Sequence, residues 1–187
     1  MNVGVLALQG AFARHARVIE SLDAAATEIR LPSDLDVVDR LIIPGGESTT
    51  MSFMIDWNGL EPVLRQRIQA GMPVFGTCAG MILLSSEVLD GRTDQTPLGA
   101  IDISVRRNAF GRQIDSFETD LDITGLDAPF PAVFIRAPAV TRAGDGVEVL
   151  AKVEDQAVLC RQGSTMVAAF HPELSDDRRL HQLFLER

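Results

Sequence analysis

One cysteine lies where the sequence predicts a sharp turn from a strand into a helix. Cys78 is the central residue of the segment Gly76–Gly80 (GTCAG), between the apolar runs Pro73–Phe75 and Met81–Leu84. This is the layout of a nucleophile elbow, which exposes a reactive side chain at the N-terminus of a helix. The backbone N–H groups and the helix dipole at that position favour a thiolate. The alternative is a buried structural cysteine, because free cysteine is often buried.

A histidine and a glutamate close to the C-terminus could complete the chemistry of such a thiol. The apolar run Met166–Phe170 predicts a buried strand, which leads directly into His171, Pro172 and Glu173. A nucleophilic thiol needs a base, and the base needs a group that holds its tautomer. We therefore expect Cys78, His171 and Glu173 to form a catalytic triad, with Pro172 stiffening the backbone between base and acid.

Composition limits the kind of protein this chain can be. Its 187 residues fit one domain, 1–187, and 46 % hydrophobic residues are enough for a substantial core. The net charge of −9 argues against nucleic acid as a partner, because a phosphate-binding surface needs the opposite sign. We find no apolar run long enough to span a membrane and no basic N-terminal region typical of a signal peptide.

The two cysteines do not form a disulfide framework, so a reducing cytoplasm is the expected compartment. Cys160 lies in a strand-like segment, and we interpret it as a small buried hydrophobic residue. His15 and His181 are isolated from any cysteine spacing motif. We expect them on the surface or on helices, and we expect no metal site.

The hydrophobic pattern predicts an α/β fold with a mainly parallel sheet flanked by helices and an antiparallel extension. Short apolar runs predict strands, and runs with helical spacing predict helices. In the second half, short strands are joined by Gly and Asp turns, and the last two form a hairpin across Gln162 and Gly163. The predicted strands are Val3–Leu8, Thr27–Leu31, Leu41–Pro44, Val74–Phe75, Ile101–Val105, Val133–Ile135, Val147–Val153, Ala157–Arg161 and Thr165–Phe170. The predicted helices are Phe12–Leu22, Thr49–Ile55, Leu60–Ala70 and Leu180–Leu185.

Four sequence features each follow a predicted strand and should meet at one edge of the sheet. They are Gln9–Gly10, Gly45–Gly46, Cys78 and His171. In open α/β sheets, ligands bind outside the carboxyl ends of the strands. Paired glycines let backbone N–H groups approach a substrate, and an acyl intermediate needs such donors for its oxyanion. The N–H groups of Gly46 and Ala79 are our candidates, although a plain turn would also explain the two glycines.

These motifs together resemble the triad (class I) glutamine amidotransferases, and more narrowly the glutaminase subunits of bacterial pyridoxal 5′-phosphate synthases. Ile82 stands where many other triad glutaminases carry Gln, and this departure suits the pyridoxal branch. The resemblance implies a flavodoxin-like sheet of the class I amidotransferase kind. It rests on six segments that span nearly the whole chain in the family's order: Leu6–Phe12, Pro44–Thr50, Gly76–Met81, Arg107–Gln113, Phe134–Pro138 and Phe170–Leu174.

The resemblance also implies the substrate and the residues that bind it. The activity is hydrolysis of L-glutamine to L-glutamate and ammonia, without a cofactor or metal. An arginine suits the α-carboxylate of glutamine and a glutamate suits its ammonium group. Without the resemblance, surface salt bridges would explain the two arginines, and a helix N-terminal charge would explain the glutamate. The implied substrate-binding residues are Gly45, Gly46, Glu47, Arg107, Ile135 and Arg136.

The family further implies a partner, because ammonia must reach a second active site. That partner is a separate, barrel-shaped synthase subunit, which binds phosphorylated sugars and forms a hetero-oligomer with the glutaminase. Gln9 and Gly10 would form a switch loop, since glycine permits a peptide flip. The alternatives are a glutaminase serving another pathway, such as imidazole or anthranilate synthesis, and a non-catalytic binding or redox module that needs only Cys78.

Overall fold

The computed structural model describes residues 1–92, 97–107 and 116–186, in which strands and helices alternate over the first half. The strands are β1 (Asn2–Leu6), β2 (Ala25–Ile29), β3 (Arg40–Ile43), β4 (Val74–Thr77), β5 (Ser85–Val88), β6 (Ile101–Arg106), β7 (Phe117–Leu121), β8 (Phe130–Phe134), β9 (Ala139–Ala143), β10 (Glu148–Val153), β11 (Gln156–Gln162) and β12 (Thr165–Ala168). The α-helices are α1 (Phe12–Glu20), α2 (Ser48–Trp57), α3 (Leu60–Gln69), α4 (Ala79–Leu84) and α5 (Arg179–Leu185), and two 3₁₀ turns are η1 (Pro32–Val37) and η2 (Pro172–Leu174).

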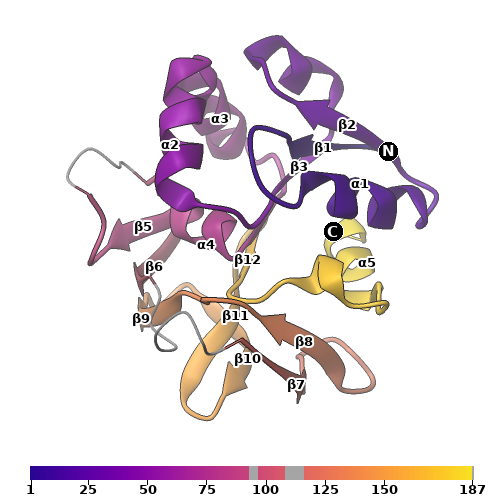
Figure 1. Ribbon diagram of the computed structural model, residues 1–187, viewed down its shortest axis with the longest axis vertical. Coiled ribbons are helices and arrows are strands. Elements are labelled where there is room, and N and C mark those ends of the chain that lie inside the picture. The colour runs from indigo at the N-terminus through magenta and orange to yellow at the C-terminus, as the bar shows by residue number, and fades with distance from the viewer. Residues whose placement is uncertain (93–96, 108–115, 187) are drawn as a thin grey trace.

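The central sheet has seven strands in the order β10-β11-β12-β4-β3-β1-β2 (Figure 1). The strands from β12 to β2 are parallel, while β10 and β11 pair antiparallel. Counted along the chain, the parallel strands follow the order 2-1-3-4-5 that is typical of flavodoxin-like sheets. The predicted α/β class, parallel sheet and antiparallel extension are therefore confirmed.

Helices cover both faces of this sheet. The connections from β1 to β2 and from β3 to β4 run in opposite directions along the sheet. Right-handed crossovers therefore place α1 on one face and the pair α2–α3 on the other. Figure 1 shows α5 beside α1, close to both chain ends. No helix in the described part of the chain is long and apolar enough to cross a membrane.

The core lies between the parallel strands and their helices. The strands β3 and β4 are buried at every position except Arg40, as expected for parallel strands that helices cover on both faces. Two smaller sheets, β5-β6-β9 and β7-β8, lie in the lower part of Figure 1 beside the antiparallel extension. The sequence did not predict β5, β7 and β9, which are only four or five residues long and each carry at least two exposed residues.

Candidate active site

The turn from β4 to α4 places Cys78 in a strained backbone conformation. Its φ of 50° and ψ of −103° are unusual for a residue with a side chain and cost roughly 1–3 kcal/mol. The turn is held by the Cys78 N–H, which donates to Ala168 O at 2.8 Å. A Cβ on Gly80 would lie 2.1 Å from Ile43 O, so the turn packs too tightly for any larger residue there. This is the geometry of a nucleophile elbow.

Hydrogen bonds of the backbone and of the side chain also fix His171, which follows β12. The His171 N–H donates to Val133 O at 2.8 Å, and the ring Nδ1 lies 2.8 Å from Glu173 Oε1. Pro172 opens the turn η2 and fixes the backbone between the two side chains. The carboxylate of Glu173 is fully buried and the His171 side chain is 11 % exposed, so the glutamate lies behind the imidazole.

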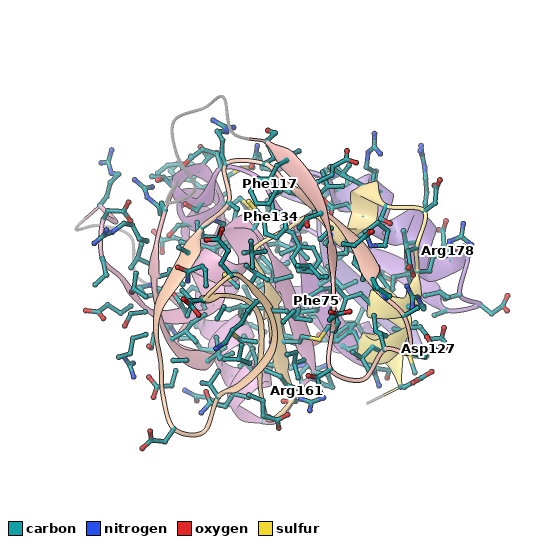
Figure 2. The ribbon with its side chains drawn as sticks, turned by 90° about the horizontal axis from the view of Figure 1, so that it is seen from below. Phe75, Phe117, Asp127, Phe134, Arg161 and Arg178 are labelled. Atoms are coloured by element: carbon teal, nitrogen blue, oxygen red, sulfur yellow. The ribbon has the colours of Figure 1, made fainter. Side chains whose placement is uncertain are left out.

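An aromatic stack supports the segments around His171. Phe134, the last residue of β8, stacks on Phe117 with a centroid distance of 4.6 Å and an interplanar angle of 7° (Figure 2). Phe134 also packs against Phe170 at 5.5 Å, directly before His171. The stack therefore links β7 and β8 to the end of β12.

Strand pairing brings the cysteine and the histidine together. β4 and β12 are parallel neighbours with Thr77 opposite Ala168, so the two side chains follow adjacent strand ends. Gly45 lies between them, since a Cβ there would be 2.4 Å from His171 Cε1 and 3.3 Å from Cys78 Cβ. Glycine at this position is thus required by the close approach of the two side chains.

The surroundings of His171 favour its charged form. Burial lowers the pKa of His171, but hydrogen bonds and charge interactions with Cys78 and Glu173 outweigh burial and raise the pKa to about 10. Burial raises the pKa of Glu173, yet the hydrogen bond from His171 and the interactions with His15 and His171 hold it below its usual range. The pair is therefore an ionised carboxylate that orients an imidazole.

A pocket of about 380 Å³ opens at the carboxyl ends of the parallel strands. Among the predicted site residues, Glu173 alone does not line the pocket, because His171 covers the glutamate. Its lining holds the others, contributed by the loops after β1, β3, β4, β6, β8 and β12: Gln9, Gly10, Gly45, Gly46, Glu47, Cys78, Ala79, Arg107, Ile135, Arg136 and His171. A larger cavity of about 610 Å³ lies along α2, but its lining residues include neither cysteine nor histidine.

Glu47 and Arg107 both line the pocket, and both contact the first turn of α2. The Glu47 carboxylate caps this helix by accepting from the N–H groups of Thr49 and Thr50 at 3.0 and 2.7 Å. Burial raises the pKa of Glu47, but these hydrogen bonds and those of the two hydroxyls lower it to about 2. Arg107 Nη1 donates to Thr49 Oγ1 at 2.9 Å, and its buried Nε has no hydrogen bond to any described residue. The rest of the predicted Arg107–Gln113 motif, residues 108–113, lies outside the described residues.

The loop after β1 is packed against the paired glycines. Gly10 has a φ of 91°, and a Cβ there would lie 1.8 Å from Gly45 O. Gln9 Oε1 accepts from the Glu47 N–H at 2.8 Å. Ile135 and Arg136 follow β8, which begins and ends earlier than the predicted strand. Ile135 O lies 4.0 Å from Cys78 Sγ.

Comparison with known proteins decides the family. The model of the SNO glutamine amidotransferase family matches residues 5–187. The chain belongs to this family. Among curated relatives, the pyridoxal 5′-phosphate synthase subunit PdxT of Mycobacteroides abscessus is 57 % identical over 98 % of this chain and 95 % of its own length. The PdxT protein of Herpetosiphon aurantiacus is 54 % identical over 99 % of both chains.

Solved structures agree with this assignment to the SNO family. A crystal structure described as a glutamine amidotransferase has a TM-score of 0.93 and 49 % identity, and the match covers 98 % of this chain and 97 % of that chain. A putative GMP synthase protein from Thermoplasma acidophilum has a TM-score of 0.67 at 18 % identity, over 100 % and 92 % of the two chains. The second likeness, at 18 % identity, concerns the fold alone.

Two histidines of this SNO family member lie on helices behind the site. His15 and His181 are on helices, as expected, but both are fully buried and not on the surface. His15 Nε2 lies 3.3 Å from Glu173 Oε2. The available signal was helical spacing, because His15 stands four residues before the buried Ile19 and therefore shares its face.

Proposed function

We propose that this chain is a single glutaminase domain, 1–187, which hydrolyses L-glutamine to L-glutamate and ammonia through Cys78, His171 and Glu173. One observation carries the proposal. A cysteine on a strained turn and a histidine oriented by a buried glutamate line one pocket, in a chain of the glutamine amidotransferase family. A non-catalytic module that needs only Cys78 would have no use for the His171–Glu173 pair.

The proposed reaction has two steps. The Cys78 sulfur attacks the side-chain amide carbon of glutamine, and His171 gives the leaving nitrogen its proton, so that ammonia departs and a thioester forms. A water molecule activated by His171 then attacks the thioester, and glutamate and the free thiol result. The N–H groups of Gly46 and Ala79 would stabilise the oxyanion of both steps.

The walls of the pocket suit a free amino acid. Arg107 has a buried Nε without a partner among the described residues, which favours it over the exposed Arg136 as the donor to the α-carboxylate. Glu47 is ionised, and its oxygens have lone pairs beyond those that cap α2, so the carboxylate can also attract the ammonium group. Gly45, Gly46, Ile135 and Arg136 would complete the substrate site.

The ammonia would pass to a synthase subunit that makes pyridoxal 5′-phosphate. The names of relatives more than half identical over nearly the whole chain support this partner. We propose a barrel-shaped synthase subunit in a hetero-oligomer, and a reducing cytoplasm that keeps Cys78 a thiol. The close packing of Gly10 against Gly45 O supports a switch role for Gln9 and Gly10, because this loop lies directly beside the paired glycines.

Glutamate release from glutamine, measured with and without the synthase subunit, tests the proposal. We expect release that needs Cys78 and rises when the synthase is added, with Cys160→Ala as the matched control. Cys78-dependent release that ignores this synthase would keep the glutaminase and overturn the partner, as expected for imidazole or anthranilate synthesis. Folded protein that releases no glutamate under either condition would overturn the function.

A further inference from the structure

A chain of buried polar side chains continues inward from Glu173, away from the pocket. His15 Nε2 lies 3.3 Å from Glu173 Oε2 and 3.3 Å from Thr77 Oγ1. His15 Nδ1 lies 3.0 Å from His181 Nε2. The side chains of His15, Glu173 and His181 are buried in the interior, between α1, α5 and the ends of β4 and β12. The reaction proposed above uses neither His15 nor His181.

The partners of each nitrogen fix where the protons lie. Glu173 is ionised and can only accept, so the neighbouring His15 Nε2 must carry a proton. Burial lowers the pKa of His15 despite the opposite pull of Glu173, so its ring is neutral and Nδ1 is an acceptor. His181 Nε2 must then donate to His15 Nδ1. This leaves His181 Nδ1 without a proton, and it has no hydrogen-bond partner among the described residues.

We propose that His15 is a positioning residue of the triad, which holds the second oxygen of Glu173 through its Nε2–H while His181 fixes its tautomer. The inference rests on the proposed function. Glu173 thereby has a ring nitrogen beside each oxygen: His171 Nδ1 is hydrogen-bonded to Oε1 at 2.8 Å, and His15 Nε2 lies in contact with Oε2 at 3.3 Å. His15 also touches Thr77, the residue before Cys78, so one imidazole links the supports of both the nucleophile and the base.

Packing alone does not account for this cluster. Leucine or phenylalanine would fill the same space without the cost of burying an imidazole. A buried carboxylate, in contrast, needs polar partners. Glu173 Oε2 makes no hydrogen bond to any described residue, so the His15 Nε2 that lies 3.3 Å away is the polar group available to it. Removal of the His15 donor would free the carboxylate to turn or to take up a proton, and His171 would lose its fixed orientation.

Nitrogen NMR of the imidazole rings tests the proton positions directly and does not depend on activity. The chain has 3 histidines, so the ring signals are few and can be assigned with single variants. We expect His15 and His181 to be neutral and protonated at Nε2 in the wild-type protein. We expect His181→Phe to release His15 into a mixture of tautomers. A wild-type His15 protonated at Nδ1 would overturn the inference.

Kinetics in the presence of the synthase subunit test the positioning role. We expect His15→Leu to lower kcat for glutamate release by about 10- to 100-fold with little change in KM, by analogy with the loss of the supporting partners of metal-bound histidines. His15→Gln, whose amide N–H can replace the Nε2 donor, should recover part of the loss. The matched control is Ile19→Val, which alters the same buried face of α1 without touching the triad.

The outcomes separate this inference from the proposed function. Unchanged kcat in His15→Leu, or equal loss in His15→Gln, would overturn the positioning role. A similar drop in the folded Ile19→Val variant would also overturn it, because general disturbance of α1 would then explain the effect. A wild-type protein without glutamate release would overturn the proposed function instead.

Discussion

The two cysteines lie in the same sheet region but in opposite surroundings. Cys78 follows β4 on a turn with positive φ, is 8 % exposed and lines the pocket with His171. Cys160 lies inside β11 between Val149 and Val167 of the neighbouring strands, and it is fully buried. Burial raises the pKa of the Cys160 thiol to about 11. The difference teaches that access and a neighbouring base, not the residue type, separate a reactive thiol from a structural one.

The largest difference between the two cysteines should be in activity. We expect Cys78→Ala to lower glutamate release by at least about 10⁴-fold, because loss of the nucleophile leaves only substrate binding and the oxyanion donors. The measurement is kcat with the synthase present, with circular dichroism to show that the variant is folded. Substantial release by this variant would remove Cys78 from the proposed mechanism.

The next largest effect on activity should come from Glu173, whose carboxylate supports the surroundings of Cys78 and has no counterpart described for Cys160. We expect Glu173→Gln to lower kcat by about 10³-fold, since an amide no longer holds the imidazole in the required tautomer. Steady-state kinetics measure the loss. Wild-type activity in this variant would show that His171 needs no orienting anion.

The stability of the protein should report the pairing of Cys78 with His171. The pKa of His171 is raised from its ordinary value of 6.5 to about 10. The stabilisation from its charged form is therefore fully present below about pH 6.5 and is lost as the pH rises towards 10. We expect the free energy of unfolding to fall by up to a few kcal/mol over this range relative to His171→Gln.

Urea denaturation at several pH values measures this dependence. Part of the His171 shift comes from Cys78. The dependence should therefore shrink in Cys78→Ala and stay unchanged in Cys160→Ala. An equal dependence in both cysteine variants would contradict the assigned cause.

The smallest effect is expected at the structural cysteine. Cys160→Ala removes one buried atom, so we expect a loss of about 1 kcal/mol in unfolding free energy and unchanged kcat. Thermal denaturation and the glutamate assay together check this. A large loss of activity would show that the two cysteines are not separable in function.

Much of the fold could be predicted because parallel strands have a strong hydrophobic signal. The apolar runs that became β1, β3 and β4 are buried on both faces and stand out in the sequence. The hairpin of β11 and β12 could be predicted for the same reason, and the structure confirms it. In contrast, β7 (FETDL) carries polar residues on one face and belongs to a two-stranded sheet, so its short alternation resembled a loop.

The pocket could be predicted in the same way, since its residues follow strand ends that must meet at one edge of the sheet. What could not be predicted is the support behind them. His15 and His181 are 166 positions apart and become neighbours only when α1 and α5 pack on the same face. The approach of Gly10 to Gly45 O likewise depends on the placement of β1 beside β3.

The pairing of β4 with β12 has a consequence for how the protein is made. Cys78 is synthesised with the first half of the chain, but the strand that leads to its proposed base, His171, is the last of the sheet. During synthesis, Cys78 therefore emerges from the ribosome well before His171 has been added to the chain. The elbow can close its hydrogen bond to Ala168 O only after nearly the whole polypeptide has emerged. By the proposed mechanism, unfinished or C-terminally cleaved chains should thus carry the thiol without hydrolysing glutamine.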